Sequence, residues 1–180
     1  ELSHFANGFL IGSALMSHDD LHAAVRRVLL GENKVCGLTR AQDANAAYEA
    51  GAIYGGVIFV PTSPRAVNVE QAREVMTGAP LQYVGVFRNS DITDVSATAA
   101  ELGLTAVQLH GNEDQSYVDA LREVLPAQVQ IWKALSVSET LPARDYQHVD
   151  KYVFDNGQGG SGQRFYWTLL GGQSLDNVLL

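Results

Sequence analysis

Two side chains stand at the ends of apolar segments and suit acid–base chemistry. Cys36 lies in the run Lys34–Gly37, and Asp155 closes the run Lys151–Asp155. The cysteine is either a buried apolar side chain or a thiolate that acts as a general base, which requires nearby cations or a helix N-terminus. The aspartate either caps the segment that follows it or serves as an acid. From the residues alone, both alternatives stay open at each position.

Two further side chains suit substrate binding. Arg65 follows the sequence Pro-Thr-Ser-Pro at 61–64, and a loop stiffened by two prolines presents a guanidinium well to a carboxylate or a phosphate. The alternative is a solvated surface arginine. His110, in the sequence Val-Gln-Leu-His-Gly at 107–111, either makes hydrogen bonds in a site or is simply a histidine at the end of a strand.

Two glycine-containing segments raise the question of phosphate binding. Gly12 and Ser13 precede a predicted helix, so they either offer backbone N–H groups to a phosphate or form a turn of small residues. The segment 155–162 contains a formal G-x-G-x-x-G after a predicted strand, a pattern that can mark dinucleotide binding. No acidic residue ends a following strand roughly 20 residues later. We therefore interpret this segment as a loop that closes over a ligand.

The composition is that of a globular protein and excludes several classes. Of 180 residues, 46% are apolar and 18% are charged, which rules out a disordered chain or a coiled coil. The net charge of −8 disfavours nucleic acid and anionic membranes as partners. The single cysteine excludes a disulfide framework, and the five histidines form no compact ligand motif, so we expect no metal site. The apolar stretch Phe9–Met16 is too short to span a bilayer and lacks the flanks of a signal peptide, so we expect a cytoplasmic protein.

Short apolar runs alternate with helical patterns at intervals of roughly 24 residues, the length of one βα unit. The predicted strands are 34–37, 53–60, 82–87, 106–110, 129–134, 152–155 and 178–180. The predicted helices between them are 40–50, 69–77, 92–102, 114–124 and a weak one at 167–170. Asn68, with Gln71 three residues later, is a start signal for the second of these helices.

This alternation predicts an α/β fold with a parallel sheet. The runs 56–60 and 83–87 are apolar on both faces, as strands covered by helices should be. Either a (β/α)8 barrel or an open doubly wound sheet fits. Polar candidates follow several different strands, which is how a barrel assembles its active face, so we expect an incomplete (β/α)8 TIM barrel of about six βα units plus the start of a seventh strand.

The first 32 residues do not join this series smoothly. They predict a strand at Phe9–Leu15 and an amphipathic helix at Leu21–Leu30, opened by Asp19 or Asp20 and ended by Gly31. We expect one extra βα unit from a preceding barrel at 1–32 and the incomplete barrel at 33–180. The chain begins without Met and ends on an apolar run, so we expect a fragment.

Five segments resemble, in order and spacing, the phosphoribosylanthranilate isomerase family of tryptophan biosynthesis. They are 34–39, 59–65, 84–87, 107–111 and 154–155 with the glycine-rich loop that follows. The segment 8–16 resembles the last βα unit of indole-3-glycerol-phosphate synthase, and this order is that of the bifunctional enzymes whose synthase domain precedes the isomerase domain.

The resemblance implies a role for each candidate residue. Cys36 would be the general base, Asp155 the general acid, Arg65 a contact for the anthranilate end of the substrate and His110 a further contact. The implied reaction is the Amadori rearrangement of N-(5-phosphoribosyl)anthranilate, a small phosphorylated molecule, without cofactor or metal. The implied partner is the preceding synthase domain, of which too little is present for synthase activity. An inactive fragment of such an enzyme is the alternative, and a nucleotide-binding oxidoreductase is a third.

Overall fold

The chain forms one parallel sheet that curves into an open arc. The computed structural model describes residues 13–156, 167–172 and 174–180. Its strands lie side by side in chain order, and every neighbouring pair is parallel. They are β1 (Lys34–Cys36), β2 (Tyr54–Ile58), β3 (Gln82–Phe87), β4 (Ala106–Leu109), β5 (Gln130–Ser136), β6 (Lys151–Asp155) and β7 (Val178–Leu179). This order, without a reversal, is that of a barrel and not of a doubly wound sheet.

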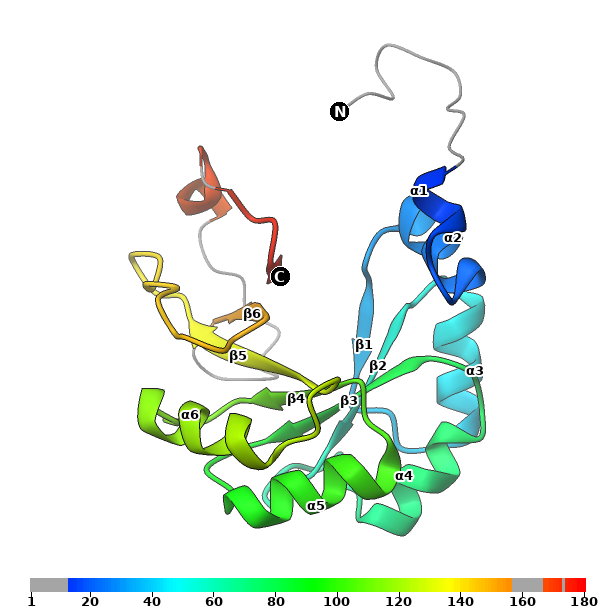
Figure 1. Cartoon of the computed structure of the whole chain (residues 1–180), viewed down its shortest axis with the longest axis horizontal. Helices are drawn as coiled ribbons and strands as arrows, with labels where there is room; N and C mark the ends of the chain where they lie inside the picture. The colour runs from blue at the N-terminus through cyan, green and yellow to red at the C-terminus, as the bar shows by residue number, and fades with distance from the viewer. Residues whose placement is uncertain (1–12, 157–166, 173) are drawn as a thin grey trace.

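Helices cover the outer side of the arc, as Figure 1 shows for α3 to α6. The helices are α1 (Ser13–Met16), α2 (Leu21–Leu30), α3 (Ala41–Glu49), α4 (Val69–Met76), α5 (Ile92–Leu102), α6 (Gln115–Val124) and the 3₁₀ helix η2 (Trp167–Leu170). The predicted start of α4 is confirmed, because Asn68 and Gln71 form a reciprocal capping box. The predicted α/β class and barrel-like curvature are therefore confirmed, while the count of units in a complete barrel stays a prediction.

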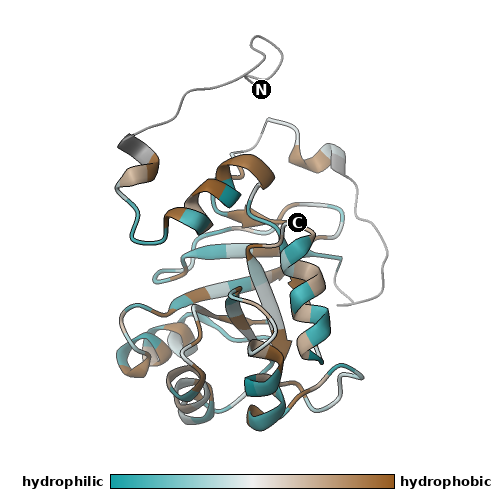
Figure 2. Cartoon of the chain, turned by 90° about the vertical axis from the view of Figure 1, so that its right-hand side faces the viewer, coloured by the Kyte–Doolittle hydropathy of each residue, from teal (hydrophilic) through white to brown (hydrophobic). Residues whose placement is uncertain are grey.

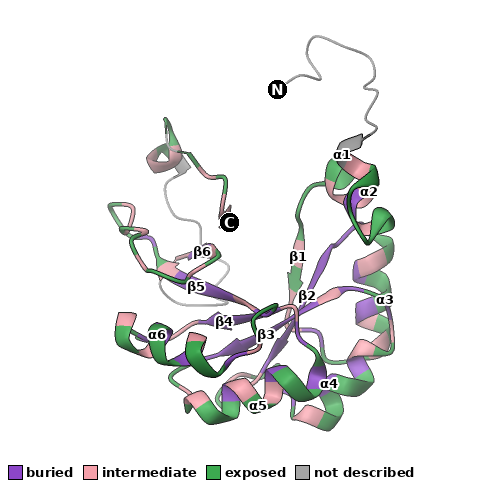
Figure 3. Cartoon of the chain, viewed as in Figure 1, coloured by how far each residue is buried: buried purple, intermediate pink, exposed green. Residues whose placement is uncertain are grey.

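The central strands β2 to β5 are largely buried on both faces, which explains their strongly apolar sequences (Figures 2 and 3). Strand residues of one parity, among them Val57, Val107 and Ile131, pack against the helices in the larger core cluster. Residues of the other parity, among them Val84 and Trp132, form a smaller cluster on the inner side of the arc. Because side chains alternate along a strand, this parity decides which polar residues face the inside of the arc.

The N-terminal helix α2 agrees with the sequence, but the strand predicted before it does not. Asp20 caps α2 by accepting a hydrogen bond of 2.9 Å from the Ala23 N–H, and Gly31 ends the helix. The prediction of a strand at Phe9–Leu15 is wrong where the structure describes it, because Ser13–Met16 is helical. Ala, Leu and Met are strong helix formers, and no described strand pairs with this segment. Residues 9–12 lie outside the described residues.

Helix α2 lies at the amino ends of the strands. Arg27 donates a 2.7 Å hydrogen bond to Gln82, the first residue of β3, and also pairs with Glu32. Glu32 in turn pairs with Lys151, the first residue of β6. The helix is thereby tied to strands on both sides of the arc. Whether residues 1–32 complete a preceding barrel stays a prediction.

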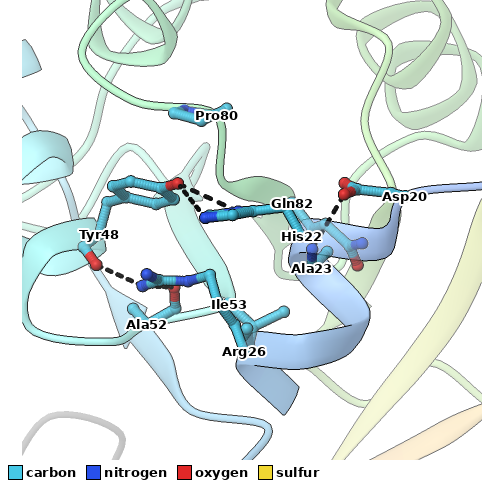
Figure 4. Close-up of a pocket in the computed structure, with 9 residues that line it drawn as sticks. All are labelled: Asp20, His22, Ala23, Arg26, Tyr48, Ala52, Ile53, Pro80 and Gln82. Atoms are coloured by element: carbon cyan, nitrogen blue, oxygen red, sulfur yellow. Dashed lines mark hydrogen bonds between the residues drawn. The ribbon is translucent and has the colours of Figure 1, made fainter. Parts of the chain in front are cut away.

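A cavity of about 230 Å³ lies beneath α2, between Arg26, Tyr48 and Gln82 (Figure 4). Its arginine does not point freely into the space. Arg26 donates hydrogen bonds to the backbone carbonyls of Tyr48 and Ala52, and its guanidinium lies 4.2 Å from the centre of the Tyr48 ring. The hydrogen bonds of Arg26 at this cavity attach α2 to helix α3 and to the loop that follows it.

Candidate active site

The predicted base and the predicted anion-binding arginine lie together at the carboxyl end of β1. Arg65 Nη1 donates a hydrogen bond of 2.8 Å to the backbone carbonyl of Cys36. The arginine is brought there by the loop after β2, which turns back so that Ala66 forms a bridge with Ile58. Arg65 itself remains exposed, so its other nitrogens are available to a ligand.

Gly37 makes this close approach of Arg65 possible. Its φ is +85°, and a Cβ atom at this position would lie 2.4 Å from Arg65 Nη1. Any other residue would both strain the backbone and displace the guanidinium. The glycine that follows the cysteine is therefore part of the site's geometry.

The predicted acid and the predicted histidine also lie together. His110 Nε2 is 3.1 Å from Asp155 Oδ2, although the two residues are 45 positions apart in the chain. The other carboxyl oxygen of Asp155 accepts a 2.7 Å hydrogen bond from the Asn156 N–H. Gln108, two residues before the histidine, contacts His110 Nδ1 through its amide nitrogen at 3.2 Å. A chain of polar contacts thus runs from β4 to the end of β6.

Both pairs face the inside of the arc. A Cβ atom on Gly56 would lie 2.7 Å from Cys36 Sγ, and Gly56 has the same parity as Tyr54 in the inner cluster. On β6, Val153 packs against that inner cluster and Asp155 is two residues further on. The proposed base and acid therefore project from the two flanks of the arc into one interior space, at the same edge of the sheet.

A cavity of about 130 Å³ opens beside the His110–Asp155 pair. Its lining residues include Arg88, Asn112 and Ser136, which follow or end the strands β3, β4 and β5. Arg88 adds a second exposed cation at the carboxyl edge. Two guanidiniums at this edge suit a substrate with carboxylate and phosphate groups.

A buried ion pair supports the floor of this cavity. Lys133 Nζ donates 2.7 Å to Glu113 Oε2 and 2.9 Å to the Gly111 carbonyl, and the side chains of the pair are only 3% and 1% exposed. Glu113 also accepts from the backbone N–H groups of Asn89 and Gly111. The pair therefore fixes the peptide that directly follows His110.

The charge of Glu113 is stabilised by this network. Burial alone would raise the pKa of Glu113, but hydrogen bonds from Lys133 and from the Asn89 backbone outweigh it and lower the pKa. Nearby, burial raises the pKa of Tyr117 to about 12, with the carboxylates of Glu113 and Asp91 contributing. Both groups therefore hold one protonation state near neutral pH.

Several predictions fall where the structure gives no test. Gly12 lies outside the described residues, and Ser13 begins α1, so their proposed phosphate contact stays a prediction. The glycine-rich segment 157–162 also lies outside the described residues.

Across residues 13–156, 167–172 and 174–180, no group of three or more His, Cys, Asp or Glu residues could hold a metal ion. In the same residues, no helix is long and apolar enough to cross a membrane.

The sequence prediction missed Gln108, Lys133 and Arg88. The first two are polar residues inside otherwise apolar strands, and that exception to the pattern was a usable signal. Arg88 directly follows β3, in the position that the other candidates occupy on their strands. Position at a strand end would have selected it as well.

The fold and these polar strand ends define a barrel-like α/β protein with a candidate site at the carboxyl edge of the sheet. Among protein families, residues 33–180 match the one described as N-(5'phosphoribosyl)anthranilate (PRA) isomerase. The phosphoribosyl anthranilate isomerase of Thermus thermophilus is 31% identical, with a TM-score of 0.67 over 77% of this chain and 69% of that one. A phosphoribosyl anthranilate isomerase solved with reduced 1-(o-carboxyphenylamino)-1-deoxyribulose 5-phosphate is 30% identical, with a TM-score of 0.62 over 77% and 68% of the two chains.

The chain belongs to the N-(5'phosphoribosyl)anthranilate isomerase family. It is also similar over its whole length to longer proteins. The tryptophan biosynthesis protein TrpCF of Salmonella typhi is 81% identical and that of Yersinia pestis 68% identical, both over 100% of this chain. The chain spans 40% and 38% of the lengths of these two relatives.

Proposed function

We propose that this chain carries the isomerase chemistry of its family, the Amadori rearrangement of N-(5-phosphoribosyl)anthranilate to 1-(2-carboxyphenylamino)-1-deoxyribulose 5-phosphate. The observation that carries the proposal is the placement of Cys36 and Asp155. They face one interior space from opposite flanks of the arc, and each lies beside a polar partner. A reaction that moves a proton from carbon to oxygen needs an acid and a base arranged in this way.

The steps balance with these two groups alone. Asp155 gives its proton to the ribose ring oxygen as the C1–O bond breaks, and the nitrogen lone pair forms the Schiff base. The Cys36 thiolate then removes the C2 proton, and the electron pair of that bond moves to form the C1–C2 double bond of an enolamine. The enolamine tautomerises to the ketone as its C2 hydroxyl loses a proton to Asp155 and C1 gains the proton held by Cys36, which restores the acid and the thiolate. Arg65, beside Cys36, binds the anthranilate carboxylate and so directs C2 of the substrate toward the thiolate.

We also propose the domain bounds of this chain, its partner domain, its location in the cell and a further substrate contact. We assign residues 33–180 to the isomerase barrel and residues 1–32 to the end of a preceding synthase domain, which would be its partner in the longer chain. The family match, which begins at residue 33, supports that division, and the TrpCF relatives, of which this chain matches about two-fifths, support the longer chain. A cytoplasmic location and a role for His110 in contacting substrate belong to the same proposal.

The test is an isomerisation assay with freshly made substrate, using this chain and a version extended by two further βα units. The extended protein should be active, and Cys36→Ala and Asp155→Asn should each lower kcat by about 10²- to 10⁴-fold, the usual contribution of general acid–base groups. Asp94→Asn, on the exposed side of α5, is the matched control and should leave kcat unchanged. Inactivity of a folded extended protein, or full activity of the two variants, would refute the proposal. Activity in the extended protein alone would mark the 180-residue chain as an inactive fragment.

A further inference from the structure

Gln108 is a buried amide in a strand that is otherwise apolar. It is 2% exposed, and its neighbours on β4, Ala106, Val107 and Leu109, are fully buried. Ala106 belongs to the inner cluster, so Gln108, two residues further along the strand, faces the inside of the arc beneath His110.

Among the residues that the structure describes, the amide makes one hydrogen bond, and its partner is the histidine. Gln108 Nε2 lies 3.2 Å from His110 Nδ1. An amide nitrogen only donates, so Nδ1 accepts and carries no proton in the neutral ring. The ring proton is then on Nε2, which lies 3.1 Å from Asp155 Oδ2 and donates to it.

The other end of the amide indicates that Gln108 is not there for stability. Its Oε1 atom is buried and has no hydrogen-bond partner among the described residues. A buried acceptor without a partner destabilises a fold, and an apolar side chain of similar size would avoid that loss. The position therefore keeps an amide in spite of its cost, which points to the contact with His110 as its purpose.

From this geometry we propose that Gln108 is a positioning residue, which fixes the Nε2–H tautomer of His110 and thereby gives Asp155 a permanent hydrogen-bond donor. Asp155 Oδ2 accepts from His110 and Oδ1 accepts from the Asn156 N–H, at 2.7 Å. The inference rests on the proposed function, in which Asp155 gives its proton to the substrate. The carboxylate left by that step meets two donors already in place, which stabilises charge as it develops.

The histidine is held from its backbone as well as from its ring. Lys133 donates to the Gly111 carbonyl and Glu113 accepts from the Gly111 N–H, so the residue after His110 is held through both of its backbone polar groups. With the backbone fixed by this buried pair, the orientation of the ring depends on the side chains that bond its two nitrogens. These are Gln108 and Asp155.

The direct test is nitrogen-15 NMR of the imidazole rings in the extended protein, which reads the tautomer without any measurement of activity. The His110 signal is assigned by its loss in His110→Gln. At a pH where the ring is neutral, Nδ1 should have the nitrogen-15 chemical shift of an unprotonated ring nitrogen, and Nε2 should have that of a protonated one. In Gln108→Met, which has no donor, Asp155 still accepts from Nε2 but nothing opposes a proton on Nδ1, so the share of the Nδ1–H tautomer should rise. Gln82→Met is the same change at the amino end of the neighbouring strand β3, and it should leave the tautomer of His110 unchanged.

A protonated Nδ1 in the unaltered protein would overturn the proposal even if every variant failed to fold, and so would an unchanged tautomer in a folded Gln108→Met. The kinetic readout is a fall in kcat of roughly tenfold in Gln108→Met with KM within about twofold, a part of the acid–base contribution. The thermal unfolding midpoint should not fall, since an orphan acceptor is removed. An unchanged kcat would overturn the catalytic part. If the extended protein proves inactive altogether, the proposed function fails, while the NMR result still decides the tautomer.

Discussion

Both edges of this sheet carry hydrogen-bonded polar side chains, but their partners differ. At the amino edge, arginines of α2 bond backbone carbonyls and a glutamine, around a cavity of about 230 Å³. At the carboxyl edge, His110 bonds both Gln108 and Asp155, and the His110–Asp155 pair lines a cavity of about 130 Å³. The larger cavity is thus the structural one. The partners of the polar groups, and not the size of the cavity, therefore distinguish the candidate functional edge from the structural one.

The buried Lys133–Glu113 pair also lies at the carboxyl edge. Its removal tests whether this edge contributes to the stability of the fold. Lys133→Met leaves Glu113 buried without its partner, so the free energy of unfolding should fall by about 3–5 kcal/mol in a urea titration. The control is Arg73→Met, which breaks an ion pair of the same 2.7 Å length whose side chains are about half exposed. That loss should stay below about 1 kcal/mol. Equal losses in the two variants would show that burial does not govern the contribution of this pair.

The same pair should make the free energy of unfolding depend on pH in the acid range. The effect should be smaller than that of Lys133→Met, because a protonated Glu113 still donates or accepts hydrogen bonds. Its pKa in the folded chain is lowered below the ordinary 4.5 of the unfolded chain. The contribution is therefore fully present above about pH 4.5 and is lost as the pH falls through the lowered folded value. Urea titrations between pH 3 and 6 should show this slope, and Glu113→Gln should reduce it. A slope that Glu113→Gln does not change would contradict the assignment.

Arg65 should separate binding from chemistry at the carboxyl edge. Removing a charged hydrogen-bond donor with Arg65→Met should raise KM by about 10- to 100-fold, equivalent to roughly 1.5–3 kcal/mol, and change kcat much less. The control is Arg40→Met, an exposed arginine of the neighbouring loop that pairs with Asp43. Steady-state kinetics of the extended protein gives both constants. A fall in kcat with an unchanged KM would show that Arg65 acts in the chemical step and not in substrate binding.

The smallest effect, and the sharpest contrast, is expected at the amino edge. Arg26→Met removes hydrogen bonds to the carbonyls of Tyr48 and Ala52, so stability should fall by about 1–2 kcal/mol while kcat and KM of the extended protein stay the same. Arg26→Lys keeps the charge and should recover part of the stability. A change in kcat in Arg26→Met would break the distinction between the two edges.

Local pattern was enough to predict which elements form and in what order. Apolar runs such as the one from Gly56 to Val60 predicted strands covered on both faces, and the capping signal at Asn68 placed the start of a helix. It failed at residues 13–15, where a run of apolar residues suits a helix as well as a strand. Only a neighbouring strand would have decided between them.

By itself, the sequence determined a parallel α/β sheet, the succession of its elements along the chain and the residues at the strand ends, because periodicity and turn chemistry act between near neighbours in the chain. Tertiary structure alone decided that His110 bonds Asp155, that Gln108 orients the ring and that Lys133 is buried against Glu113. These contacts join different strands and loops, and they depend on how the sheet curves and how its strands are staggered. Short-range patterns carry no information about either.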